Sequence, residues 1–78
     1  MDEAARREMI QSMVARLAER LKTETQDVEG WLRLMRAYTV LDERDKAREA
    51  SEAARRALGD ESARARIDAL ARDLGLGG

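Results

Sequence analysis

Six hydroxyl groups are the side chains of this sequence that could in principle attack a substrate as nucleophiles. They belong to Ser12, Thr23, Thr25, Thr39, Ser51 and Ser62. A hydroxyl must be activated by a neighbouring base, yet the 78 residues include no His, and the alternative nucleophile Cys is also missing. The amines are limited to Lys22 and Lys46. The sequence therefore predicts no catalytic residue and no enzyme activity.

Carboxylates could hold a metal ion or act as a general acid and base. The 16 Asp and Glu residues are scattered along the chain, and they do not follow the spacing of a calcium-binding loop. His and Cys, the preferred ligands of transition metals, are missing from the sequence. We therefore expect neither a metal site nor a cofactor.

The balance of charges bears on the class of partner. Fifteen Lys and Arg residues nearly cancel the 16 acidic ones, which leaves a net charge of −1. Such a chain exerts little long-range attraction on nucleic acid or on an anionic membrane. Only one Trp and one Tyr are present for base stacking, and no apolar run approaches the roughly 18 residues that would span a membrane. We expect neither nucleic-acid binding nor direct membrane contact.

The candidate residues must be positioned by helices, because Ala, Arg, Leu and Glu dominate the sequence and β-branched residues are few. Apolar residues recur with the helical period in four segments. These segments are 3–22, 27–41, 45–58 and 60–74. The short connections favour antiparallel neighbours. The sequence therefore predicts a single all-α domain over residues 1–78.

Several residues predict where the helices begin and end. Asp27 and Asp60 precede apolar-periodic segments and are expected to be N-caps. Gly59 is expected to end the third helix in the left-handed conformation. Gly75 followed by Leu76 fits a Schellman end, and we expect the last residues, 75–78, to form a disordered tail.

A repeat motif lies in the second and third segments. Its residues are Trp31-x-x-Leu34-Met35-x-x-Tyr38, followed by Ala47-x-x-x-Ser51 and Gly59. It resembles the tetratricopeptide repeat (TPR) pattern W-x₂-L-G-x₂-Y…A-x₃-F…P. Three positions depart from the pattern, since Met, Ser and Gly replace its Gly, Phe and Pro. The resemblance implies one TPR helix pair over 27–58, between a flanking helix over 3–22 and a capping helix over 60–74.

A closer resemblance extends over roughly residues 9–58. The run Met9-Ile10-x-x-Met13-Val14-x-Arg16-Leu17-Ala18-x-Arg20-Leu21, with the later run Asp27-Val28-Glu29-Gly30-Trp31-Leu32-Arg33-Leu34, is similar to the repeat domain of the cytochrome c-type biogenesis family of CcmI/CycH type. The family resemblance implies a periplasmic domain that holds apocytochrome c through its C-terminal helix. The family also has a membrane anchor and further repeats, which are not found in these 78 residues.

The repeat resemblance implies that the partner-binding groove is lined by the first helix of the pair, on the side that faces the concave surface of such repeats. The candidate groove residues are Glu29, Leu32, Arg33, Arg36, Thr39 and Val40. Trp31 and Tyr38 are expected in the core, since both lie on the apolar stripe of that helix. The alternative for the Arg residues is that they are solvated and make ion pairs within their own helix.

The apolar residues of the first helix allow an alternative. Two heptads of a coiled-coil seam are matched by Ile10, Val14, Leu17 and Leu21, which could form a homodimer or exchange the helix between copies. The chain would then be a homo-oligomerising structural or regulatory helical domain of a larger complex. The primary prediction stays a protein or peptide partner, with apocytochrome c as the client that the family resemblance implies.

Overall fold

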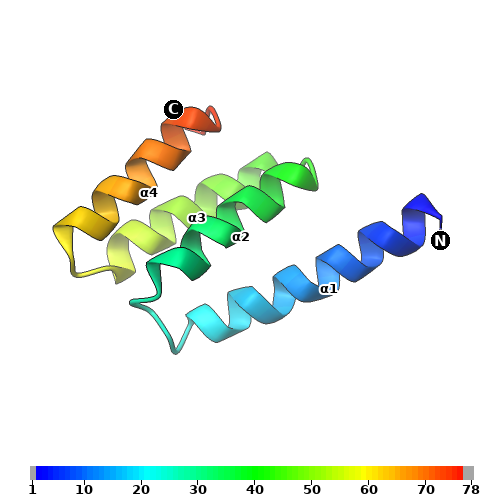
Figure 1. Cartoon of the computed structure of the whole chain (residues 1–78), viewed down its shortest axis with the longest axis horizontal. Helices are drawn as coiled ribbons and strands as arrows, with labels where there is room; N and C mark the ends of the chain where they lie inside the picture. The colour runs from blue at the N-terminus through cyan, green and yellow to red at the C-terminus, as the bar shows by residue number, and fades with distance from the viewer. Residues whose placement is uncertain (1, 77–78) are drawn as a thin grey trace.

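The computed structural model describes residues 2–76, and these residues fold into four helices joined by short turns (Figure 1). The helices are α1 (Glu3–Leu21), α2 (Val28–Val40), α3 (Arg44–Ala57) and α4 (Glu61–Asp73). Within this range there is no β-strand. The prediction of an all-α stack of four helices is confirmed. None of the helices in residues 2–76 is long and apolar enough to cross a membrane.

Helices α1, α2 and α4 start where the side chain of an aspartate caps a free backbone N–H group, whereas α3 starts without a side-chain cap. The N–H of Gly30 donates a hydrogen bond of 3.1 Å to Oδ1 of Asp27. At the start of α4, the N–H of Ala63 donates one of 2.9 Å to Oδ2 of Asp60. Both aspartates were predicted as N-caps, and both predictions are confirmed. A cap of this kind typically stabilises its helix by about 1 kcal/mol.

The end of α4 has the predicted Schellman geometry. Gly75 adopts a φ of +73°, its N–H donates to the carbonyl of Arg72, and the N–H of Leu76 donates to the carbonyl of Ala71 at 2.8 Å. Leu76 is only 2% exposed. The prediction of a disordered tail over 75–78 is therefore wrong for Gly75 and Leu76, because the side chain of Leu76 is part of the core. The rest of that tail, residues 77–78, lies outside the described residues.

The turn between α2 and α3 uses the same geometry without a glycine. Asp42 has a φ of +59°, and its N–H donates to the carbonyl of Thr39 at 3.0 Å. The N–H of Glu43 donates to the carbonyl of Tyr38 at 2.8 Å. Asp tolerates the left-handed region better than most residues, but it is still disfavoured there relative to glycine. This Schellman end lets α3 begin at Arg44.

The end of α3 differs from the prediction. Gly59 does not adopt the left-handed conformation, because Leu58 is already extended, with φ −75° and ψ 127°. The side chain of Gln26 caps this end instead. Its Nε2 donates to the carbonyl of Ala57 at 2.7 Å, and its Oε1 accepts from the N–H of Gly59 at 3.0 Å. A residue from the α1–α2 loop thus anchors that loop to α3.

Helix α2 is the centre of the stack. It packs against α1, α3 and α4, whereas α1 packs against α2, and Figure 1 shows α1 at one edge of the stack and α4 at the other. Alanines let α3 approach α2 closely, and Ala47 and Ala54 are fully buried. The core consists of Val14, Leu21, Trp31, Leu32, Leu34, Met35, Leu41, Ala47, Ala50, Ala54, Leu58, Ala63, Ile67 and Leu76. Trp31 is in the core as predicted. Tyr38 is half-buried and packs against the core.

Candidate functional site

Four of the six predicted groove residues lie on one exposed strip of α2. Glu29, Arg33, Arg36 and Val40 are all exposed, and their spacing of three or four residues places them on one side of the helix. This strip is what remains of the α2 surface after α1, α3 and α4 have packed against the helix.

Two of the predicted groove residues do not line a groove. Leu32 is only 4% exposed and belongs to the core. Thr39 is half-buried, and its hydroxyl donates to the carbonyl of Met35, one turn earlier in α2, at 2.9 Å. The prediction for Leu32 and Thr39 is corrected because α2 is covered by three neighbouring helices, so its free surface is narrower than that of a helix with one partner.

Within the described structure, the acidic residue of the α2 strip forms an ion pair, whereas its two arginines do not. Nη2 of Arg66 in α4 approaches Oε2 of Glu29 to 2.6 Å, which links α4 to the start of α2. An exposed pair of this kind adds little stability, but it balances the carboxylate charge. Among the described residues, Arg33 and Arg36 are in no ion pair. The strip therefore presents a net positive charge.

An apolar groove runs between α1 and α2, next to this strip. We call it the α1–α2 groove; it encloses about 290 Å³ and is lined by Ile10, Met13, Val14, Leu17, Arg20, Arg33 and Ala37. Its floor comes from the apolar stripe of α1 and from Ala37, whose short side chain leaves space between the helices. Such a volume is at the lower edge of the range of small-ligand pockets, and it accommodates several apolar side chains of a partner.

One exposed large apolar side chain lines this groove, and two more lie one turn away along the same helices. In the described part of the chain they are Met9, Met13 and Val40, with exposed fractions of 49%, 60% and 73%. Met13 lines the groove directly, Met9 lies one turn before it on α1, and Val40 lies one turn after Ala37 on α2. Exposed apolar side chains that gather in one place mark interaction sites, and Met adapts its shape to varied partners.

The homodimer seam predicted on α1 is largely used inside the chain. Val14 is 5% exposed and Leu21 is fully buried, because both pack into the core beside α2. Ile10 and Leu17 are half-buried on the groove floor. These four residues therefore do not form one free face, and a dimer through all of them would require α1 to leave α2.

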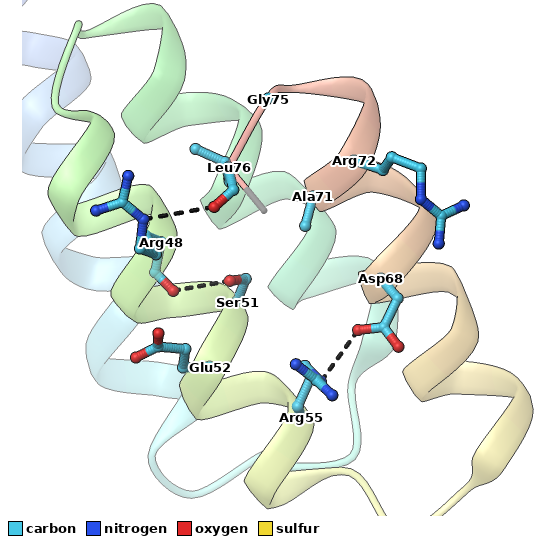
Figure 2. Close-up of a pocket in the computed structure, with 9 residues that line it drawn as sticks. All are labelled: Arg48, Ser51, Glu52, Arg55, Asp68, Ala71, Arg72, Gly75 and Leu76. Atoms are coloured by element: carbon cyan, nitrogen blue, oxygen red, sulfur yellow. Dashed lines mark hydrogen bonds and ion pairs between the residues drawn. The ribbon is translucent and has the colours of Figure 1, made fainter. Parts of the chain in front are cut away.

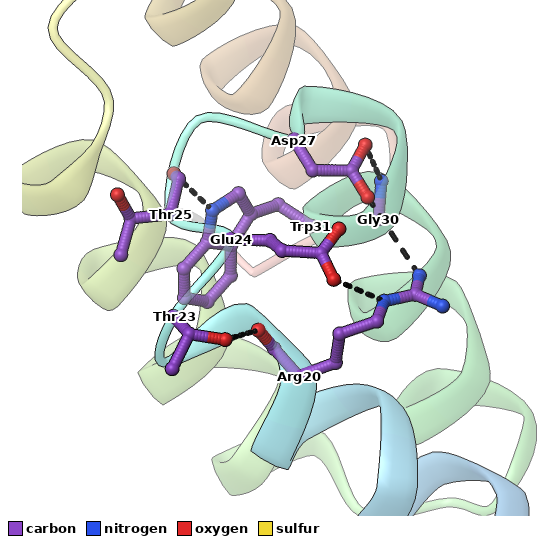
Figure 3. A network of polar contacts seen from close by, with 7 residues as sticks. All are labelled: Arg20, Thr23, Glu24, Thr25, Asp27, Gly30 and Trp31. Carbon is purple, nitrogen blue, oxygen red and sulfur yellow. Dashed lines mark hydrogen bonds and ion pairs between the residues drawn. The ribbon is translucent and has the colours of Figure 1, made fainter.

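Polar contacts hold the α1–α2 loop together beside the groove residue Arg20 (Figure 3). Arg20 lies 3.8 Å from a carboxylate oxygen of Glu24 and 3.7 Å from one of Asp27. The indole Nε1 of Trp31 donates to the carbonyl of Thr25 at 2.9 Å. The loop is thus held against the first turn of α2, and Arg20 is directed toward the end of the groove.

A second hollow lies between α3 and α4 (Figure 2). It encloses about 410 Å³, and Ser51 and Ala71 form part of its wall. Nε of Arg55 lies 3.0 Å from Oδ1 of Asp68 across the hollow. The hydroxyl of Ser51 donates to the carbonyl of Arg48 at 2.7 Å, so this hydroxyl is engaged with its own helix. Charges that already pair within the chain make this hollow a weaker candidate than the α1–α2 groove.

The sequence-based prediction placed the groove on the second helix alone and considered the apolar stripe of the first helix only as a homodimer face. Met13 and Arg20 of α1 and Ala37 of α2 line the groove, and none of them was selected. A signal was available, because Met9 and Met13 are spaced four residues apart beside the apolar stripe of the first helix. An apolar stripe wider than one partner helix can cover indicates a second contact surface.

Comparison with known proteins places these observations in a family context. The chain is 49% identical over 79 aligned residues to the cytochrome c-type biogenesis protein CycH of Bradyrhizobium diazoefficiens, a match that covers 100% of the chain and 21% of that protein. It is 43% identical to the protein of the same name from Rhizobium meliloti, a match that covers 97% of the chain and 20% of that protein. The chain thus spans about a fifth of the length of these curated relatives.

No family model matches the chain, and no solved structure matches it either. The TPR character of the α2–α3 pair therefore stays a prediction. The names of these two relatives match the cytochrome c-type biogenesis family that the sequence was found to resemble. The chain is homologous, along its whole length, to a segment of the cytochrome c-type biogenesis proteins named CycH.

Proposed function

We propose that this chain is a protein-binding module that acts without catalysis in cytochrome c maturation. In this proposal, a polypeptide segment of the client docks in the α1–α2 groove. The names of the two relatives support the assignment to cytochrome c maturation. The choice of this groove as the docking site rests on one observation, which is that its lining is mainly apolar and includes the exposed side chain of Met13.

The client that we propose is an apocytochrome c, held through its C-terminal helix. A haem-free cytochrome exposes apolar side chains that haem would otherwise cover, and such a chain gains most from an apolar docking surface. A helix that lays its apolar side into a groove is a recurrent way of binding a peptide. The setting that we propose is the periplasm, and the TPR-type pair of α2 and α3 would serve to hold the α2 wall of the groove in place.

The decisive experiment is a titration of the isotope-labelled chain with a haem-free cytochrome c, followed by backbone amide shifts. We expect shifts at Met13, Arg33 and Ala37, and much weaker ones with the haem-loaded protein. Met13→Glu should reduce the affinity by roughly tenfold, because it places a charge on the apolar wall. Shifts confined to other helices, or equal binding of both cytochrome forms, would contradict the proposal.

Ser12→Glu is the matched control for that variant. Ser12 is exposed and precedes Met13 in α1, and one residue along a helix turns the side chain by about 100°. The control therefore adds the same charge on the side of α1 that faces away from the groove, and binding should be unchanged.

A homo-oligomerising helical domain is the second candidate, since the same exposed methionines could meet in a second copy of the chain. Light scattering at two concentrations separates the two candidates. A monomer at both concentrations supports client binding. Self-association that Met13→Glu abolishes would instead favour the oligomer.

A further inference from the structure

We infer that the α1–α2 groove selects an amphipathic helix of about three turns whose apolar stripe is flanked by acidic side chains. The inference rests on the proposed function through one shared premise, namely that a partner binds in the α1–α2 groove. It goes further by stating the length and the charge of the occupant, and it derives from the groove itself why the occupant is a helix.

The occupant must be helical because of what the groove offers to a backbone. The floor is formed by the apolar side chains of Ile10, Val14, Leu17 and Ala37, which cannot pair with N–H or C=O groups. An extended peptide pressed against this floor would leave buried backbone groups without partners, at a cost of about 1–3 kcal/mol for each group. A helix satisfies these groups internally.

The length of the occupant follows from the wall that α1 provides. Its exposed edge runs from Met9 to Arg20, which are eleven residues apart. At the rise of an α-helix, this corresponds to about 16 Å, or three turns. A partner helix of the same length could place three apolar side chains at spacings of i, i+3 or i+4, and i+7 along the floor.

The charge of the occupant follows from the rims of the groove. Two charged residues line the groove, Arg20 on α1 and Arg33 on α2. Each has an arginine one turn away on the same side of its helix, Arg16 on α1 and Arg36 on α2. Both are exposed, so each of the two helices that border the apolar floor carries two arginines near it.

The nearby acidic residues cancel only part of this charge. Glu24 and Asp27 pair with Arg20 and neutralise it, and Glu29 is paired with Arg66. Within residues 2–76, Arg16, Arg33 and Arg36 are in no ion pair. Carboxylates of a partner could form pairs with them, and arginine binds carboxylates with two parallel hydrogen bonds.

The same rims disfavour a second copy of the chain as the occupant. Two grooves that face one another would bring arginine rims together, and like charges at close distance repel. The apolar floor is also recessed between two helices, so a flat lipid surface would reach Met9 and Met13 but not Ile10 or Leu17. The combined apolar and basic character thus favours an acidic helix.

Three synthetic peptides of about 14 residues test the inference. They share one leucine stripe and a lactam bridge on the opposite side that keeps them helical, and they differ in carrying Glu, Gln or Lys beside the stripe. By fluorescence anisotropy at low salt, we expect the Glu peptide to bind roughly tenfold more tightly than the Gln peptide, and the Lys peptide most weakly. The preference should shrink as salt screens the charges.

A charge-reversal pair supplies the internal control. The double variant Arg33→Glu and Arg36→Glu should reverse the order of the Glu and Lys peptides. The matched double variant Arg56→Glu and Arg72→Glu changes the net charge equally on α3 and α4, and it should preserve the original order. Equal binding of all three peptides, or the same reversal in both double variants, would overturn the inference. So would a chain that binds anionic lipid vesicles or its own copy but none of the peptides.

These outcomes separate the inference from the proposed function. If the Glu peptide binds at the groove and haem-free cytochrome c does not bind, the proposed client is wrong and the inference holds. If haem-free cytochrome c shifts the groove residues but the peptides bind without regard to charge, the client is supported and the inference fails.

Discussion

Gly30 of α2 lies so close to Leu21 of α1 that a Cβ atom on the glycine would stand 2.9 Å from Cδ2 of the leucine. The same Cβ would stand 2.6 Å from Oδ2 of Asp27, the N-cap of the helix. No Cβ packs comfortably at these distances. The contact brings α1 and α2 together at the loop end, and the α1–α2 groove lies further along the same pair of helices.

Gly30→Ala should therefore destabilise the chain, although Ala normally favours a helix. We expect a net loss of about 1 kcal/mol in the free energy of unfolding, since overpacking costs about 1–3 kcal/mol and helix propensity returns up to about 1 kcal/mol. Gly59→Ala is the matched control, because a Cβ there would meet its nearest atom, Oε1 of Gln26, at 3.8 Å. Urea unfolding measures both, and equal stability of the two variants would refute the close contact.

Gln26→Ala should weaken the attachment of the α1–α2 loop to α3. The variant loses the hydrogen bonds to Ala57 and Gly59, each of which contributes about 0.5–1.5 kcal/mol. We expect a loss of about 1–2 kcal/mol, read from thermal unfolding by circular dichroism. Gln11→Ala removes the same side chain from an exposed position in α1, and its stability should stay within about 0.5 kcal/mol of the parent.

Asp42→Gly should stabilise the chain, because the left-handed φ of +59° is accessible to glycine without a clash. The gain should be about 0.5–1 kcal/mol after the extra flexibility of glycine in the unfolded chain is subtracted. Asp42→Ala keeps a Cβ but loses the polar group that makes Asp tolerable there, and it should destabilise by a similar amount. Chemical denaturation should rank the Gly variant as the most stable and the Ala variant as the least stable of the three proteins. Any other order would contradict the prediction.

Leu76→Ala should destabilise the chain by about 2–4 kcal/mol, although Leu76 is only two residues from the end of the sequence. The reason is that Leu76 is a core residue, 2% exposed, at the Schellman end of α4. Ala65→Gly, at an exposed position within α4, should cost about 1 kcal/mol through helix propensity alone. A smaller effect at Leu76 than at Ala65 would mean that the C-terminal segment is not docked.

Local sequence signals were sufficient for most of the fold. The helical period and the aspartate caps act within a few residues, so Asp27 and Asp60 could be identified as helix starts from the sequence alone. Trp31 could likewise be assigned to the core. The Schellman end at Gly75 and Leu76 was also predictable, because a glycine followed by an apolar residue has a known geometry.

The remaining features depend on contacts between distant residues. Gln26 caps a helix that ends more than thirty residues later, and nothing in its immediate sequence indicates that pairing. Leu32 could not be recognised as buried without knowing that three helices pack around α2. The candidate groove has the same origin, since Met13 and Ala37 belong to different helices. Sequence periodicity identifies the apolar face of a helix, but it does not show which neighbouring helix packs against that face.

The position of α1 at the edge of the stack has an energetic consequence. Because α1 packs against one neighbour while α3 and α4 each pack against two, α1 should detach by local unfolding at a lower free-energy cost than the other helices. Its amides should therefore exchange with deuterium fastest. An occupant of the groove would touch both α1 and α2 and would protect those amides, so part of its binding energy would be used to keep α1 in place. Affinity could then be tuned by substitutions that strengthen α1 without touching the client at all.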